Sequence, residues 1–368
     1  MGGLAYAFLY FPYVLAEALA GLPELSYSIA WMGSGLILWL TLSGAVKPLR
    51  SGGRLREQVL RPVVLVHVVF AGYMALTSIF FFLSATGVAL LGHESGPAGA
   101  EAMARIAAAQ RFYVLGHAAL ATGLLLTYDY RTSGSWRIRS RVPLAWFMFR
   151  IVLVATAGSA MLAFVPGLAQ LSIRLRMVAL VASVLGLALA IPFRHPGLLA
   201  MSASLYAMNV VQALLSGWKE EIIVVLGLLA VFAFPFYRRT VMVLTPLVMA
   251  AVLIVLPTYN AVFRHLAWQG DYTARQASEV ALQVIASGSA DLAGNARAFL
   301  VGRASEIGTF VTYIRHTPSE NDFAGLRIAE QAVTMLMPRA MWPGKPDVEK
   351  LVMERVYDNG VVARTSRV

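Results

Sequence analysis

The chain has 368 residues, of which 58% are hydrophobic and only 13% charged, and it contains no cysteine. An ordinary soluble domain carries about 25% charged residues, so the composition excludes a typical soluble enzyme. The lack of cysteine excludes disulfides, thiolate metal sites and cysteine nucleophiles. The net charge of +11 would favour a nucleic-acid partner only if the basic residues gathered on one soluble surface. They are spread along the chain, so we expect no nucleic-acid partner.

Nine apolar segments are long enough, or nearly long enough, to cross a bilayer as helices. They cover residues 4–20, 27–46, 62–84, 112–128, 142–165, 177–193, 196–215, 222–237 and 241–259. The third apolar run continues to Leu91, which is longer than one span requires, and the eighth segment is short. We therefore expect an all-α polytopic membrane protein with about nine transmembrane helices in residues 1–259.

The loops between these segments predict the orientation of the chain. Twelve lysines and arginines lie in one set of alternating loops and five lie in the other. Cytoplasmic loops carry the excess of basic residues, so this count predicts a cytoplasmic N-terminus. Nine spans then place residues 260–368 outside the membrane.

The polar tail has the periodicity of an extracytoplasmic helical domain. Apolar residues recur at helical spacing from Ala277 to Ile285, from about residue 291 to 314, and from Leu326 to Met337, where Pro338 follows. A last short helix is expected to begin near residue 347. Arg303 falls inside the apolar stripe of the second helix, so we expect it to be buried with a partner or to face a cavity.

Arginine is the distinctive residue of this tail. Arg297, Arg303, Arg315, Arg327 and Arg339 occur within 43 residues. Guanidinium groups bind phosphate in a bidentate fashion and keep their charge at any relevant pH. The anion available at a membrane surface is a lipid-linked phosphate or pyrophosphate. The alternative is that these arginines contact lipid headgroups and maintain solubility.

Motifs of soluble enzymes are missing, and the histidines suggest no metal centre. There is no Walker A loop, no dinucleotide-binding glycine motif, no H-E-x-x-H and no G-x-S-x-G. The six histidines are scattered along the chain, so we expect no compact metal cluster. His67 and His117 lie inside predicted spans, where packed structural histidines are favoured over functional intramembrane residues.

Three sequence elements resemble those of a known family of membrane enzymes. They are Ser216-Gly217-Trp218-Lys219 before a late span, Gly302-Arg303 in the external tail, and Pro338-Arg339-Ala340-Met341-Trp342-Pro343-Gly344-Lys345-Pro346. Together with the many spans, these elements resemble the oligosaccharide repeat-unit polymerases, that is, the O-antigen polymerase (Wzy) family. This family is similar to the GT-C class of integral-membrane glycosyltransferases.

The resemblance implies an enzyme of the bacterial inner membrane that acts on its outer side. The implied reaction polymerises undecaprenyl-pyrophosphate-linked oligosaccharide repeat units into a surface polysaccharide, without a metal or other cofactor. Implied partners are this lipid-linked substrate, membrane lipid and a chain-length regulator. The family usually has arginine where Lys219 stands, and it usually returns to the membrane after the external loop, whereas no further apolar run follows Tyr259.

The reaction must stabilise charge on the leaving pyrophosphate and remove a proton from the attacking sugar hydroxyl. The resemblance assigns the first task to Arg303 and Arg339, with Lys219 in support. His316, Glu220, Glu221 and Asp322 are candidate bases by their chemistry and predicted side of the membrane. We expect the substrate to be bound by Arg297, Arg315, Arg327, Trp342 and Lys345.

Other functions remain open at this point. An O-antigen ligase, which transfers a finished glycan to a lipid A core, would share an arginine-lined external site. A transporter of lipid-linked oligosaccharides would carry charges through its spans and an internal repeat, and neither pattern is evident. A noncatalytic subunit of envelope assembly is the fourth possibility.

Overall fold

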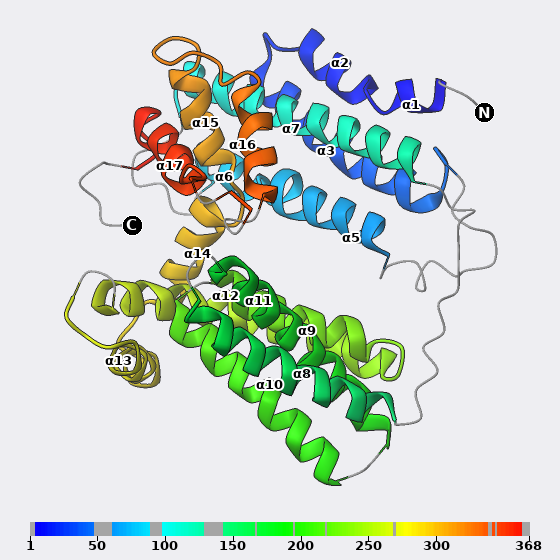
Figure 1. Cartoon of the computed structure of the whole chain (residues 1–368). Coiled ribbons are helices and arrows are strands. Elements are labelled where there is room, and N and C mark those ends of the chain that lie inside the picture. Colours follow the sequence, from blue (N-terminus) through cyan, green and yellow to red (C-terminus); the bar gives the residue numbers. More distant parts are fainter. Residues whose placement is uncertain are drawn as a thin grey trace. The chain divides into compact units, whose positions relative to one another are not determined.

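A computed structural model describes most of the chain as helices (Figure 1). The described residues are 4–47, 61–88, 98–128, 143–165, 168–193, 196–217, 219–267, 270–337, 341–342 and 344–362, and none of them is in a β-strand. Contacts divide the chain into two compact units. Unit 1 comprises Met1–Ser135, Arg297–Phe323 and Arg355–Ala363, and unit 2 comprises Trp136–Ala296, Ala324–Glu354 and Arg364–Val368.

Unit 1 is a bundle around the long helix α7. Its helices are α1 (Leu4–Phe8), α2 (Phe11–Ala18), α3 (Pro23–Ser43), α5 (Pro62–Val69), η1 (Phe70–Leu76), α6 (Ile79–Ala85), α7 (Ala100–Thr127) and α15 (Ile307–His316). Its core contains the stacked rings of Tyr27 and Phe82, and Ile307 from the tail is buried in the same cluster. The tail helix α15 is therefore part of the packing of this unit.

Unit 2 is built from the later helices. They are α8 (Leu144–Ala163), α9 (Ala169–Phe193), α10 (Pro196–Ser216), α11 (Lys219–Ala233), α12 (Arg238–Ala267), α13 (Ala274–Ala286) and α16 (Arg327–Leu336). Ala277 and Ala281 of α13 are buried against Tyr259 and Phe263 of α12. Two helices, α14 (Leu292–Arg303) and α17 (Val348–Asp358), contribute residues to both units.

Six described helices are long and apolar enough to cross a membrane. They are Pro23–Ser43, Pro62–Ala85, Leu144–Ala163, Gln170–Pro192, Pro196–Ser216 and Arg238–Ala267, and Glu221–Ala233 is a shorter apolar helix. By length and composition, the chain is thus an α-helical, multi-pass membrane protein.

The first predicted span is wrong as a continuous helix. Residues 4–20 form the short helices α1 and α2, which are interrupted at Leu9 and Tyr10. Pro12 lies in the first turn of α2, and proline has no backbone N–H with which to continue a preceding helix. The predicted span at 112–128 also differs, because it is the second half of α7, which begins at Ala100.

The third predicted span contains a segment of π-helix. The helix runs from Pro62 through η1 and α6 and ends at Ala85. A π-helical turn adds a residue to the turn and changes the direction in which the following side chains point. This change in side-chain direction falls between His67 and Ser78, which are both fully buried.

The tail helices at α13, α16 and α17 confirm the predicted periodicity, whereas the predicted helix over 291–314 is wrong. Two helices, α14 and α15, occupy this stretch. The Ser305 hydroxyl lies between them, donates to the Met74 carbonyl oxygen at 3.1 Å and accepts from the Ile307 amide at 3.3 Å. The two units also cut across the predicted boundary at residue 259, because tail segments belong to both units; the location of residues 260–368 outside the membrane stays a prediction.

Candidate functional site

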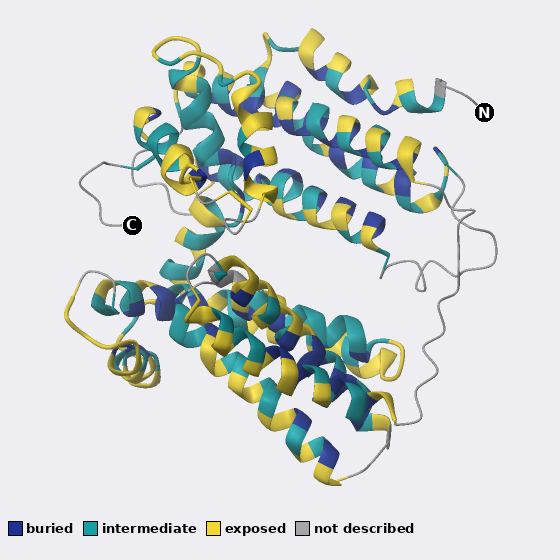
Figure 2. Ribbon diagram, viewed as in Figure 1, coloured by how far each residue is buried: buried dark blue, intermediate teal, exposed yellow. Residues whose placement is uncertain are grey.

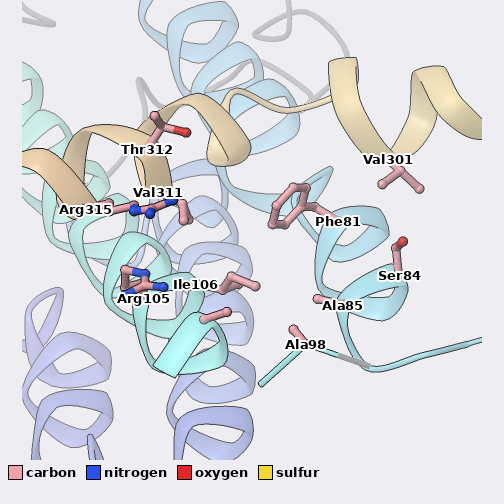
Figure 3. Close-up of a pocket in the computed structure, with 11 residues that line it drawn as sticks. Phe81, Ser84, Ala85, Ala98, Arg105, Ile106, Val301, Val311, Thr312 and Arg315 are labelled. Atoms are coloured by element: carbon pink, nitrogen blue, oxygen red, sulfur yellow. The ribbon is translucent and has the colours of Figure 1, made fainter. Parts of the chain in front are cut away.

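A cavity of about 250 Å³ lies within unit 1 (Figure 3). It is lined by Phe81, Ser84 and Ala85 of α6, by Ala98 before α7, by Ala102, Arg105 and Ile106 of α7, by Val301 of α14, and by Val311, Thr312 and Arg315 of α15. Two arginines and two hydroxyl side chains therefore face a wall that is otherwise apolar. Such a cavity suits a ligand that combines an anionic group with apolar or sugar surfaces.

The packing of α15 fixes one wall of this cavity. Ile307 is fully buried, and the ring of Phe310 stacks on Tyr113 with centroids 5.3 Å apart. Gly308 faces Phe81, and a Cβ at this glycine would lie only 3.1 Å from the Phe81 ring. A side chain there would require the Phe81 ring or α15 to shift by a few tenths of an ångström, so the glycine permits the close approach of the two helices.

Arg315 and Arg105 supply the positive charge of the cavity. Figure 3 shows the two guanidinium groups on the same side of the cavity, one from α15 and one from α7. Arg105 is ion-paired with Glu101 one helical turn earlier. Arg315 is exposed, and its guanidinium group has no ion pair with a described residue. Because Glu101 partly neutralises Arg105, Arg315 is the stronger ligand for an anion.

His316 follows Arg315 but does not line the cavity. Its Nδ1 lies 2.9 Å from the Thr312 carbonyl oxygen, and a carbonyl oxygen only accepts hydrogen bonds, so Nδ1 carries the proton. In the neutral ring Nε2 then holds the lone pair, and it lies 3.8 Å from a carboxylate oxygen of Glu320. The ring is mostly buried, and a Cβ at Gly360 would lie 3.7 Å from Nε2. This tautomer leaves Nε2 as the basic atom.

Arg297 and Arg303 are both exposed on α14, and neither lines the cavity. The expectation that Arg303 is buried on an apolar stripe is wrong. The helix ends at Arg303 and a separate helix begins at Ile307, so the predicted apolar stripe does not continue from Arg303 to residue 314 as one surface. Arg303 lies at the exposed C-terminal turn, where a cation also complements the helix dipole.

The remaining predicted ligands belong to unit 2. Arg327 is exposed at the start of α16, and Trp342 is 41% exposed. Lys345 is buried, and its Nζ donates to the carbonyl oxygens of Met337 at 2.9 Å and Met335 at 3.4 Å. These bonds satisfy carbonyl groups at the end of α16 and account for Lys345 without a ligand.

The side chains of two catalytic candidates lie outside the described part of the chain. Arg339 lies outside the described residues, as does the side chain of Lys219, which begins α11. Gly217 follows the last residue of α10 and has a left-handed φ of 70°, and its carbonyl oxygen accepts a hydrogen bond from Nε of Arg264 at 2.9 Å. Of the other candidate bases, Glu221 and Asp322 are exposed, and the side chain of Glu220 is outside the described part of the chain.

Most residues of helix α16 are exposed, the apolar ones included (Figure 2). Leu326, Val333 and Leu336 are 87%, 64% and 82% exposed, whereas the polar Thr334 is buried. An amphipathic helix of a soluble protein buries its apolar side chains instead. In a membrane protein, exposed apolar side chains beside an exposed Arg327 match the pattern of helices at the membrane interface.

Comparison with known proteins places the chain in a family. The sequence profile described as domain of unknown function DUF8712 matches residues 11–368. The chain belongs to this family. No curated protein and no solved structure matches the chain.

Within this member of the DUF8712 family, sequence reasoning missed Arg105. The count of basic residues in loops treated it as a topological charge. The available signal was its position in residues 98–110, an alanine-rich stretch of good helix-forming residues that extends α7 beyond the predicted span. Arg105 and Arg315 line the same cavity only because of tertiary packing, so no local sequence pattern could predict that they come together.

Proposed function

We propose that the protein is a membrane glycosyltransferase that polymerises undecaprenyl-pyrophosphate-linked repeat units on the outer side of the bacterial inner membrane. The observation that carries the proposal is the cavity in which Arg315 and Arg105 face apolar and hydroxyl side chains. A lipid-linked pyrophosphate presents the same combination of anion, sugar and hydrocarbon.

The reaction makes two demands on the residues. The bond between the anomeric carbon of the growing glycan and its pyrophosphate oxygen breaks, and the hydroxyl oxygen of the incoming unit bonds to that carbon. The bonding electrons leave with the pyrophosphate, whose charge Arg315 stabilises with support from Arg105. The hydroxyl proton passes to a base, for which we assign Nε2 of His316; this residue follows Arg315 on α15 but lies outside the cavity lining, so the acceptor hydroxyl must approach from beside the cavity.

The proposal reassigns the leading role among the arginines. The resemblance favoured Arg303 and Arg339, whereas the cavity favours Arg315, because it is a predicted substrate ligand that lines this cavity. Arg327 and the exposed apolar side chains of α16 support contact with membrane lipid. Chain-length regulation by a partner remains part of the proposal.

The test is a gel of surface and lipid-linked polysaccharide from cells that lack the protein. These cells are complemented with wild type, Arg315→Ala, Arg315→Lys or Arg275→Ala at matched protein levels. Arg275 is the control because it is an exposed arginine of α13 that pairs with Glu279. We expect Arg315→Ala to abolish the long-chain ladder while single repeat units stay attached to lipid or core.

The outcomes separate the candidate functions. A ladder that persists on the lipid carrier but is absent from the core would indicate a ligase. Loss of every external glycan, single units included, would indicate a transporter. A normal ladder with Arg315→Ala would reject catalysis through this cavity and favour a noncatalytic subunit.

A further inference from the structure

Two buried histidines of unit 1 lie next to each other, and neither lines the cavity that contains Arg105 and Arg315. They are His67 of α5 and His117 of α7, both fully buried, with ring centroids 5.8 Å apart. None of their four ring nitrogens has a hydrogen-bond partner among the described residues. A neutral imidazole carries one donor and one acceptor, and leaving both unpaired in the interior is costly.

The same bundle pairs some of its other buried polar side chains, whereas Ser34, Tyr113 and Thr122 each have a buried hydroxyl without a hydrogen-bond partner among the described residues. The Tyr27 hydroxyl lies 2.7 Å from Oγ of Ser78, which donates to Oε1 of Gln110 at 2.9 Å. Nε2 of Gln110 donates to the Ala75 carbonyl oxygen at 3.2 Å. The histidine pair differs from these single hydroxyl groups because both nitrogens of both rings lack a partner, which leaves two donors and two acceptors unpaired side by side. The π-helix between His67 and Ser78 fits a functional role for the pair, because such segments are frequent at functional sites.

The separation of the rings matches shared coordination of one metal ion. A metal–nitrogen bond is about 2.0 Å, and the ring centre lies roughly 1.2 Å beyond the nitrogen, so two ligands in line place their centroids about 6.4 Å apart. A tetrahedral angle at the metal shortens this separation to about 5.2 Å. The observed 5.8 Å lies between these limits and corresponds to a bent arrangement. Two-coordinate Cu(I) prefers the in-line arrangement, so the rings would separate by roughly 0.6 Å when the ion binds.

The lack of anionic ligands beside the two rings in the described part of the chain favours a monovalent ion over a divalent one. The chain has no cysteine, and no group of three or more histidine, aspartate or glutamate ligands exists among the described residues. A divalent ion held by two neutral imidazoles would bury two uncompensated charges, which is far costlier than burying one. Copper accepts imidazole ligands and is available as a monovalent ion. We propose that His67 and His117 form a buried binding site for Cu(I), independent of the proposed glycosyl transfer.

The site is tested with the full chain purified in detergent and loaded with Cu(I) under reducing conditions. A chromophoric Cu(I) chelator then competes for the metal. We expect the wild type to hold one equivalent. His67→Gln and His117→Gln should each weaken binding by about 100-fold or more, because loss of even an outer-shell partner costs 10- to 100-fold.

Two further variants separate coordination from structure. His117→Met should keep Cu(I) affinity within about tenfold of wild type, because a thioether is a soft ligand for Cu(I) but cannot replace an imidazole hydrogen bond. His265→Gln, at the end of α12 in unit 2, should bind as the wild type does. Size-exclusion profiles and helical circular dichroism establish that each variant is folded.

Several results would overturn the proposal. They are a wild type that binds no Cu(I), glutamine variants that bind as tightly as the wild type, and a site that binds Zn²⁺ as tightly as Cu(I). Co-purification of a haem lost in both glutamine variants would also overturn it.

Discussion

The ring of Phe310 on α15 stacks on Tyr113 of α7, with centroids 5.3 Å apart and an angle of 13° between the planes. This contact attaches a tail helix to the bundle of unit 1, and Arg315 lies slightly more than one helical turn beyond it. The position of the cavity arginine therefore depends on an aromatic pair that itself touches no ligand.

We expect Phe310→Ala to destabilise unit 1 and to weaken anion binding indirectly. Truncating a large buried aromatic costs about 3 to 5 kcal/mol, and the partial exposure of Phe310 places it at the lower end of this range, near 3 kcal/mol. Thermal unfolding in detergent measures the loss. The matched control is Phe323→Ala, because Phe323 is 74% exposed and its truncation should leave the transition temperature nearly unchanged. Equal shifts for the two variants would contradict the role given to the stack.

Arg315→Ala should weaken the binding of a short-chain polyprenyl pyrophosphate by about 10- to 100-fold, because hydrogen bonds to charged groups contribute about 1.5 to 3 kcal/mol. Arg315→Lys should retain part of the affinity, since it keeps the charge but loses the bidentate geometry. Calorimetric titration of the purified protein measures both values. Wild-type affinity in Arg315→Ala would show that the anion binds elsewhere.

Glu101→Gln tests the unequal roles of the two arginines. The Glu101 carboxylate pairs with Arg105, so the substitution leaves the Arg105 guanidinium free to attract an anion. We expect the pyrophosphate to bind several-fold more tightly at low ionic strength, with the gain diminishing as salt screens the exposed charges. Weaker binding in Glu101→Gln would mean that the ion pair orients Arg105 for its ligand.

Elements that depend on the local sequence pattern could be predicted, whereas features that depend on tertiary packing could not. The helices α13 and α16 follow directly from their apolar periodicity, and Thr273 with Gln276 forms a capping box that begins α13. The break at Ser305 was missed because its hydroxyl bonds to Met74, which is distant in sequence. Arg105 was missed as a site residue for the same reason, because only packing brings α7 and α15 together.

Lys345 illustrates how a motif residue can serve structure. Replacing it with methionine keeps most of the side-chain volume but removes the donor to the carbonyl oxygens of Met335 and Met337. We expect a loss of about 1 to 3 kcal/mol in stability and earlier proteolysis near the end of α16. Pyrophosphate binding per folded molecule should be unchanged. A selective loss of binding in Lys345→Met, with stability retained, would instead place the ammonium group on the substrate.

His117→Phe separates stability from ligand binding in the buried histidine pair. In the absence of metal, both nitrogens of His117 are buried without partners among the described residues, so an apolar ring of similar shape removes an unsatisfied group. We expect the metal-free variant to unfold at a higher temperature than the metal-free wild type, by an amount equivalent to about 1 to 3 kcal/mol. Added Cu(I) should raise the transition temperature of the wild type, because it binds the folded state, and should leave that of His117→Phe unchanged. A metal-free variant less stable than the wild type would mean that the imidazole makes a structural interaction, and the argument for a ligand site would fail with it.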